Sequence, residues 1–240
     1  MTESPPSSPR ILGLLVAGGQ STRMGSDKAF LPYPTGSDKD AVESLWIHLV
    51  RIMLQVCPHG VLVSHNPTQA ARMKSELGLL DEAHKVRLVQ DAQGYEDIGP
   101  AAGLITAHDT QPTDTFLAVA VDFPFVNHDT LVHLRDAYES PVTTYFHPVD
   151  MHPEPLLSIW SPEALARLKR NAVDGVEGGR KRTGPCFTAK QLWKELGMSG
   201  DEVVGKCGVL PKVEADLRNT NTREEWDRAV DELRLAAVSK

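Results

Sequence analysis

The chain has 240 residues, close to the upper limit for one hydrophobic core, and 41% of them are hydrophobic. Lys and Arg total 25 against 32 Asp and Glu, and the resulting net charge of −7 argues against a nucleic-acid partner. No stretch approaches the roughly 18 consecutive apolar residues that a membrane span requires, so we expect no membrane partner. The three cysteines lack C-x-x-C spacing, which favours reduced thiols in a cytoplasmic protein.

Residues 1–9 are rich in proline and serine and lack the features of a secretory signal, which predicts a disordered tail. We expect residues 10–240 to form one domain. Two segments interrupt the regular pattern, at 32–40 and 173–184, and neither is long enough to link independent domains. Both are interpreted as mobile loops.

Regular elements follow one another along the chain. Short apolar runs bounded by Gly, Pro, Asn or Asp predict buried strands at residues 11–17, 60–64, 86–90, 116–121 and 156–160. Amphipathic stretches predict helices at 41–56, 69–77, 101–108, 129–138 and 162–169. This alternation indicates a three-layer α/β fold, with a mostly parallel sheet and helices on both faces.

Two helix starts are marked by capping residues. Ser161 followed by Pro162 suits an N-cap with Pro at the first helical position. Thr222-Arg-Glu-Glu225 fits a capping box, in which the hydroxyl and the carboxylate satisfy backbone amides at the helix start. We therefore expect the last helix to begin at Asn221 or Thr222.

The segment directly after the first strand carries the strongest functional signal, Leu15-Val-Ala-Gly-Gly-Gln-Ser-Thr-Arg-Met-Gly-Ser-Asp-Lys28. Its glycines let the backbone approach an anion, and in open α/β sheets such a loop lies at the carboxyl edge where ligands bind. A polyphosphate fits this pattern, whereas the alternative is a glycine-rich surface turn. The spacing matches neither a Walker A loop nor G-x-G-x-x-G, so an ATPase or a dinucleotide dehydrogenase loses its main support.

Residues 14–28 resemble the signature loop of the MobA-like nucleotidyltransferases, a group typified by molybdenum cofactor guanylyltransferase. The likeness continues in the family's order, through Gly99-Pro-Ala-Ala-Gly103, Val121-Asp-Phe-Pro-Phe125, Glu154-Pro-Leu156 and Asn219-Thr-Asn-Thr222. It implies a Rossmann-like nucleotidyltransferase fold. It also implies nucleotide contacts from Leu15, Ala17, Gly18, Gly19, Gly25, Lys28, Asp91, Gly99, Pro100 and Gly103.

Asp122 follows an apolar run and should emerge at the carboxyl end of a central strand, on the same edge as the glycine loop. A carboxylate there can hold Mg²⁺ against nucleotide phosphates, although it can also simply cap the turn at Pro124. Together with the resemblance, the metal role is favoured. Lys28 is then expected to hold phosphates, and Arg23 to neutralise charge on the triphosphate and on the leaving pyrophosphate.

Further polar residues have two interpretations each. Asn221 is a candidate metal ligand or only a helix cap, and Asn219 is a candidate contact to the acceptor. Asp91 ends a predicted strand; the resemblance implies a hydrogen bond to base or ribose, whereas its residue type equally suits a turn. The basic cluster Arg180-Lys-Arg182, which includes Lys181, suits the phosphate of an anionic acceptor or a solvated charge run.

The resemblance implies a Mg²⁺-dependent transferase, in which a phosphate of the acceptor, molybdopterin, attacks the α-phosphorus of GTP and pyrophosphate leaves. A protein partner from molybdenum cofactor synthesis is a further expectation. Cytidylyl transfer to the same pterin, or nucleotidyl transfer to a sugar phosphate, is the alternative chemistry. A nucleotide-binding regulatory protein without turnover is the alternative class, and the presence of both Lys28 and Asp122 counts against it.

The choice of base is expected to depend on Gly18. Guanylyltransferases of this superfamily tend to have L-A-G-G where cytidylyltransferases have L-A-A-G, and this chain has Val16-Ala-Gly-Gly19. The missing side chain at Gly18 would leave room for a purine against the backbone. The sequence therefore predicts that GTP binds better than CTP.

Overall fold

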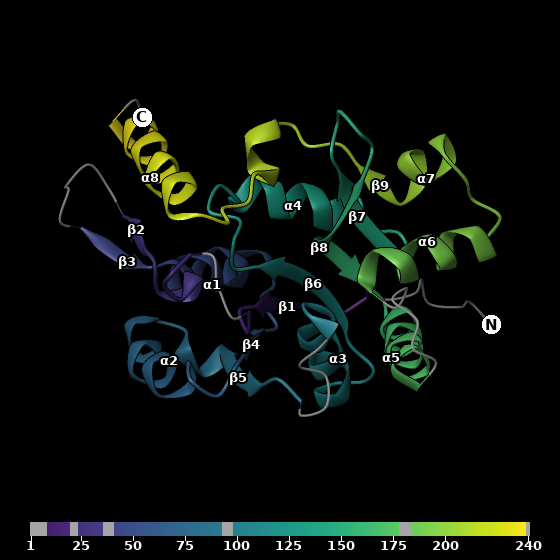
Figure 1. Ribbon diagram of the computed structural model, residues 1–240, viewed down its shortest axis with the longest axis horizontal. Coiled ribbons are helices and arrows are strands. Elements are labelled where there is room, and N and C mark those ends of the chain that lie inside the picture. Colours follow the sequence, from purple (N-terminus) through teal and green to yellow (C-terminus); the bar gives the residue numbers. More distant parts are fainter. Residues whose placement is uncertain (1–8, 20–23, 36–40, 93–97, 178–183, 239–240) are drawn as a thin grey trace, which may run out of the picture.

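The computed structural model describes residues 9–19, 24–35, 41–92, 98–177 and 184–238. At its centre lies a seven-stranded sheet with the strand order β5-β4-β1-β6-β8-β7-β9 (Figure 1). Its strands are β1 (Ile11–Val16), β4 (Val61–His65), β5 (Val86–Gln90), β6 (Thr115–Ala120), β7 (Val142–Phe146), β8 (Pro153–Trp160) and β9 (Gly208–Val209). A separate antiparallel pair is formed by β2 (Pro32–Pro34) and β3 (Val42–Ser44).

The sheet is mostly parallel. Strands β5, β4, β1 and β6 run in one direction, and β8 lies antiparallel to both β6 and β7. Because β8 reverses the direction, the hairpin between β7 and β8 has its tip at the same edge as the carboxyl ends of β1 and β6. This edge therefore gathers loops from distant parts of the chain.

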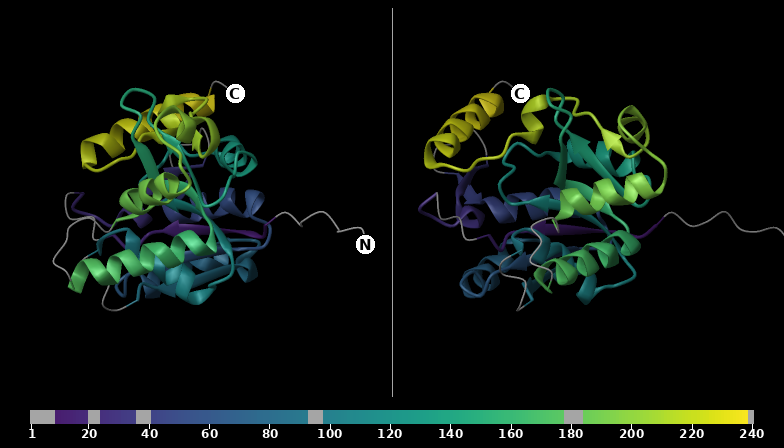
Figure 2. Two further views of the ribbon diagram at one scale, coloured as in Figure 1. Left: turned by 90° about the vertical axis from the view of Figure 1, so that its right-hand side faces the viewer. Right: turned by 45° about the vertical axis from the view of Figure 1, so that its right-hand side comes forward.

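Helices cover both faces of the sheet, with α1 and α4 on one side and α3 and α5 on the other (Figure 2). The helices are α1 (Leu45–Val56), α2 (Ala70–Glu76), α3 (Ala101–Thr110), α4 (His128–Asp136), α5 (Pro162–Glu177), α6 (Pro185–Glu195), α7 (Asp201–Lys206) and α8 (Arg223–Val238). None of the helices in the described ranges is both long and apolar enough to cross a bilayer.

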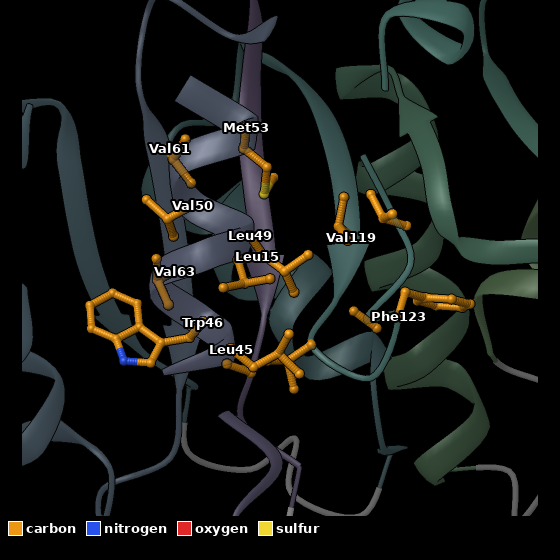
Figure 3. Packing of buried hydrophobic residues seen from close by; sticks show 14 of the residues in the cluster. Leu15, Leu45, Trp46, Leu49, Val50, Met53, Val61, Val63, Val119 and Phe123 are labelled. Carbon is orange, nitrogen blue, oxygen red and sulfur yellow. The ribbon is translucent and has the colours of Figure 1, made fainter. Parts of the chain in front are cut away.

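The core between the sheet and α1 is packed mainly with aliphatic side chains. Leu15 of β1 lies beside Leu49 of α1, and Val119 of β6 and Leu45 of α1 belong to the same buried cluster (Figure 3); all four are at most 1% exposed. Burial of each such side chain contributes roughly 1.5–3 kcal/mol. The strands that carry the glycine loop and Asp122 are thus held in a rigid frame.

The predicted fold class and five predicted strands are confirmed, with bounds shifted by at most three residues. Three expectations were wrong in detail. The helix predicted from Ala41 begins at Leu45, because residues 42–44 form β3. The loop predicted at 32–40 starts as strand β2, and the loop predicted at 173–184 is helical up to Glu177. Residues 1–8, 36–40 and 178–183 lie outside the described part of the chain.

Both predicted caps are present. The Ser161 hydroxyl accepts from the N–H of Ala164 at 3.2 Å. The Thr222 hydroxyl accepts from the N–H of Glu225 at 3.2 Å, while a carboxylate oxygen of Glu225 accepts from the N–H of Thr222 at 3.1 Å. Thr222 is therefore the cap of α8, and Asn221 is left available for another role.

Candidate active site

Backbone hydrogen bonds tie three loops to the carboxyl edge of the sheet. The N–H of Ala17 donates to the carbonyl oxygen of Ser64 at 3.0 Å. The N–H of Asp91 donates to the carbonyl oxygen of His65 at 2.9 Å, and the N–H of Val121 to that of Val16 at 3.1 Å. The pairing of the strands thus continues into the loops. The glycine loop after β1, Asp91 after β5 and Asp122 after β6 are consequently fixed side by side.

Lys28, Asp122 and Asn221 converge at this edge. The Lys28 ammonium donates to Asp122 Oδ2 at 3.2 Å and to Asn221 Oδ1 at 2.9 Å. Asp122 and Asn221 follow Lys28 in the chain by 94 and 193 residues. The side chains of Lys28 and Asp122 are 12% and 23% exposed, so their charges are only partly screened by solvent. The fold therefore assembles a cation, a carboxylate and an amide oxygen at one point.

The loop that carries Asn221 is fastened directly to the loop that carries Asp122. The N–H of Thr220 donates to the carbonyl oxygen of Asp122 at 2.9 Å. The amide of Asn221 donates in turn to Asn219 Oδ1 at 3.1 Å. Asn221 is thus held by neighbours on both sides, with its own Oδ1 directed at Lys28.

The oxygens at this point could take part in binding a metal ion. Asp122 and Asn221 offer a carboxylate and an amide oxygen, and Mg²⁺ commonly binds through one or two carboxylates together with substrate oxygens and water. Within the described ranges, no three His, Cys, Asp or Glu side chains are grouped so that they could hold a metal ion. Any cation at Asp122 would accordingly share its coordination with a bound substrate.

Lys28 belongs to a short 3₁₀ turn, Lys28–Phe30, whose start is fixed by Asp27. Oδ1 of Asp27 accepts from the N–H of Ala29 at 3.0 Å, and Ala29 itself is buried. The turn therefore has a defined orientation, and the lysine is directed toward Asp122.

Asp91 is half-buried beside the glycine loop, and this burial raises the pKa of its carboxyl group. Among the described residues, its Oδ1 has no hydrogen-bond partner. A Cβ atom added to Gly18 would lie only 1.9 Å from Asp91 Oδ2. The expectation of open space beside Gly18 was therefore wrong: the Asp91 carboxylate fills it, and Gly18 lets this carboxylate approach the backbone.

The other predicted nucleotide contacts differ in their surroundings. The Leu15 side chain lies in the core, so only its backbone faces the edge. A Cβ atom on Gly103 would lie 2.5 Å from Ser64 Oγ, which gives this glycine a packing role between α3 and β4. Gly25 and Gly99 have φ values of +69° and +61°, in the left-handed region that favours glycine.

The remaining predicted site residues are placed as follows in the chain. Ala17 and Gly19 stand in the glycine loop, and Pro100 precedes α3 at the same edge. Arg23 and the basic residues Arg180, Lys181 and Arg182 lie outside the described residues.

Sequence reasoning gave no role to Glu154, which the structure brings close to Asp122. Burial raises the pKa of Glu154, and the charge of Asp122 acts in the same direction. One oxygen of Glu154 accepts from the N–H of Leu156 at 3.2 Å, and the other lies 3.6 Å from His147 Nε2. The motif Glu154-Pro-Leu156 was visible in the sequence, but its neighbour His147 directly follows β7, a strand that the sequence did not predict.

Asn66 and Gln69 were missed as well. Asn66 follows β4 and donates from its amide to the carbonyl oxygen of Gly18 at 3.3 Å. Gln69 is buried at the start of α2 and donates to the carbonyl oxygen of Ala17 at 2.8 Å. The only signal in the sequence was their position directly after a predicted strand, where ligands of α/β proteins are usually bound.

A glycine loop after the first strand, together with a lysine and a carboxylate at the same sheet edge, defines the nucleotide-binding class of α/β proteins. The model of the MobA-like NTP transferase domain matches residues 13–185. The chain belongs to this family and is a nucleotidyltransferase.

Curated relatives support this assignment. The chain is 30% identical, over 169 residues, to a probable molybdenum cofactor guanylyltransferase of Natronomonas pharaonis, with 69% of this chain and 75% of that protein covered. It is 29% identical over 174 residues to a protein of the same description from Rhodopirellula baltica, with 68% and 73% covered.

Solved structures share the fold. A nucleotidyl transferase from Methanothermobacter thermautotroptrophicus superposes with a TM-score of 0.69 at 16% identity, covering 95% of this chain and 100% of the other. Molybdopterin-guanine dinucleotide biosynthesis protein A from Archaeoglobus fulgidus gives a TM-score of 0.58 at 17% identity, with 92% and 97% covered. The predicted family and fold class are thereby confirmed.

Proposed function

We propose that the chain is a Mg²⁺-dependent guanylyltransferase that transfers GMP from GTP to molybdopterin. The observation that carries the proposal is the convergence of Lys28, Asp122 and Asn221 beside the glycine loop. The relatives described as probable molybdenum cofactor guanylyltransferases support the same substrates. In the reaction, an oxygen of the acceptor phosphate forms a bond to the α-phosphorus of GTP, and the bond from that phosphorus to the bridging β-phosphate oxygen breaks.

The residues of the chain would act mainly by positioning and by electrostatics, because phosphoryl transfer needs no covalent protein intermediate. Asp122 and Asn221 would hold Mg²⁺, which when bound neutralises developing charge on the phosphate oxygens. Lys28 would turn from Asp122 toward the phosphates once a cation shields that carboxylate. The N–H groups of the glycine loop would bind the triphosphate.

Asp91 supports guanine over cytosine. Guanine carries an N–H at position 1 and an amino group at position 2, which together match a carboxylate acceptor. Cytosine offers an unprotonated ring nitrogen at the corresponding edge, and it would face the carboxylate with a lone pair. Oδ1 of Asp91 is buried, so the carboxylate would have to turn toward the base to make this contact, and an unpaired buried acceptor costs about 1–3 kcal/mol.

The test is a pyrophosphate-release assay with GTP, Mg²⁺ and molybdopterin. We expect release only when all three are present, together with formation of the pterin–guanine dinucleotide by mass spectrometry. Faster release with CTP would replace the guanylyl assignment by cytidylyl transfer, and release only with a sugar phosphate would replace the acceptor. Tight GTP binding without release in any combination would indicate a regulatory nucleotide-binding protein.

The base contact has its own test. ITP lacks the 2-amino group of guanine and should bind the wild type more weakly than GTP, by about tenfold for about 1.4 kcal/mol. Asp91→Ala removes the carboxylate and should reduce this difference to less than threefold. An unchanged preference in the folded variant would show that Asp91 contacts the ribose or no part of the nucleoside.

A further inference from the structure

Behind the glycine loop lies a turn, Asn66-Pro-Thr-Gln69, that joins β4 to α2. Its last residue, Gln69, is 0% exposed. A fully buried glutamine is uncommon, and its amide must find partners for both the NH₂ group and the carbonyl oxygen. Two of the partners of Gln69 flank the glycine loop of the proposed nucleotide site.

The Gln69 amide makes three hydrogen bonds. Nε2 donates to the carbonyl oxygen of Ala17 at 2.8 Å and to Asp27 Oδ1 at 3.0 Å. Oε1 accepts from the N–H of Asn66 at 2.9 Å. The orientation of the amide follows from its partners, because the first two are acceptors and the third is a donor. No other uncharged side chain of similar length supplies two donors and one acceptor.

These contacts connect the two ends of the glycine loop. Ala17 stands before Gly18, which lies against Asp91 at the proposed base contact. Asp27 caps the turn that carries Lys28 at the phosphate end. Between them lie Gly18, Gly19 and residues 24–26 of the described glycine loop, which would contact the triphosphate. A single buried amide thus fixes the distance between the start and the end of the glycine loop.

We propose that Gln69 is a positioning residue for nucleotidyl transfer, which fixes the position of the glycine loop relative to Lys28. The inference rests on the proposed function, because it assumes that the loop binds the triphosphate. Gln69 touches neither substrate nor reacting atoms in this role and acts through Ala17 and Asp27. A misplacement of reacting groups by about 1 Å can cost about 10²-fold in rate.

The test compares Gln69→Met with a matched control, Thr143→Val. Methionine has nearly the shape of glutamine but no strong hydrogen-bonding group. Thr143 is equally buried and exchanges two hydrogen bonds of 2.8 Å with the backbone of Glu139, in a strand away from the glycine loop. Both variants lose buried hydrogen bonds, so both should lower the melting temperature.

The two variants should differ in their kinetics. For Gln69→Met we expect kcat to fall about 30- to 100-fold and KM for GTP to rise about tenfold, with KM for the acceptor unchanged. For Thr143→Val we expect kcat and both KM values within twofold of the wild type. Kinetic constants of Gln69→Met that match those of Thr143→Val would overturn the proposal, since a purely structural glutamine would behave in this way.

A double-variant cycle tests the route through Asp27. Asp27→Ala removes one partner of the Gln69 amide, so its effect should overlap with that of Gln69→Met. We expect the double variant to lose at least threefold less activity than the product of the two single losses. Losses that multiply would show that Gln69 does not act through Asp27, and would overturn this part of the inference.

Direct measurement of GTP affinity by calorimetry separates this inference from the proposed function. If the wild type binds GTP but transfers GMP to no acceptor, the proposed reaction is refuted. The positioning role is then decided by affinity alone: a Kd at least tenfold weaker in Gln69→Met supports it. A Kd within twofold of the wild type, in a folded variant, refutes it.

Discussion

Gly18→Ala should have opposite effects on stability in two backgrounds. No positive φ marks Gly18, so its backbone accepts a side chain, and replacing glycine by alanine at such a position usually stabilises by about 0.4–1 kcal/mol. In the wild type, however, the new Cβ atom would lie 1.9 Å from Asp91 Oδ2 and 3.0 Å from Asp91 Cγ. Such overlap in a packed region costs about 1–3 kcal/mol.

The expected interaction free energy between Gly18→Ala and Asp91 follows from the stabilising gain and the cost of overlap. In the wild type the overlap cost of about 1–3 kcal/mol is set against the gain of about 0.4–1 kcal/mol, so Gly18→Ala should lower the free energy of unfolding by up to about 2.6 kcal/mol, with the melting temperature falling by about 2–4 °C per kcal/mol. In an Asp91→Ala background the obstacle is gone, and the same substitution should be neutral or raise the free energy of unfolding by up to about 1 kcal/mol. The next contact, with the N–H nitrogen of Asn66 at 3.5 Å, is an ordinary van der Waals distance.

The assay is denaturant unfolding of the wild type, both single variants and the double variant, followed by the change in far-UV circular dichroism. The interaction free energy is the difference between the two effects of Gly18→Ala. Equal effects in both backgrounds would refute the reasoning, because they would show that Asp91 does not occupy the space beside Gly18. GTP affinity should fall in Gly18→Ala, since the carboxylate has to move.

Three further substitutions probe the same edge of the sheet. Asp122→Asn keeps the shape of the side chain but removes its charge, so Mg²⁺-dependent turnover should fall at least 10²-fold while the melting temperature changes little. Lys28→Ala should cost about 2.7–4 kcal/mol in kcat/KM, and a loss below tenfold would show that Lys28 is peripheral. Asp91→Asn should stabilise the fold at neutral pH, because burial raises the pKa of Asp91 and so penalises its charged form. The contribution of the protonated carboxyl is complete below the unfolded pKa of about 3.9 and is lost as pH rises through the folded pKa, so the gain of Asp91→Asn should vanish in unfolding measurements near pH 3.

The sequence predicted β1, β4 and β6 because these strands are nearly continuous apolar runs, as expected for strands covered on both faces. It also predicted β5, an edge strand whose apolar residues are interrupted by Arg87. It did not predict β7, since Thr143 and Thr144 interrupt the apolar pattern. In the structure both threonines are fully buried, and their hydroxyls donate to the carbonyl oxygens of Glu139 and Glu154. Hydrogen bonding to the backbone makes these residues acceptable in the interior, and a hydrophobicity pattern does not register it.

The glycine loop and Asp122 could be placed at one edge from sequence because both follow predicted parallel strands. Asn221 could be assigned only by resemblance, as no local pattern relates it to Lys28, 193 residues away. The contact of Gly18 with Asp91 was equally inaccessible. It depends on the side-chain direction of a residue two strands away in the sheet, which is set by packing and not by local sequence.

Buried polar groups at the carboxyl edge divide into two kinds once their hydrogen bonds are counted. The Gln69 amide uses its donors and its acceptor within the protein, so it can hold the frame without a ligand. Oδ1 of Asp91 and the hydroxyl of Thr220 are buried without a partner among the described residues, and such groups are costly unless something binds them. Both kinds are polar residues near strand ends in the sequence and look alike there. Their hydrogen bonds distinguish the groups that are satisfied within the protein from those that the described part of the protein leaves without a partner.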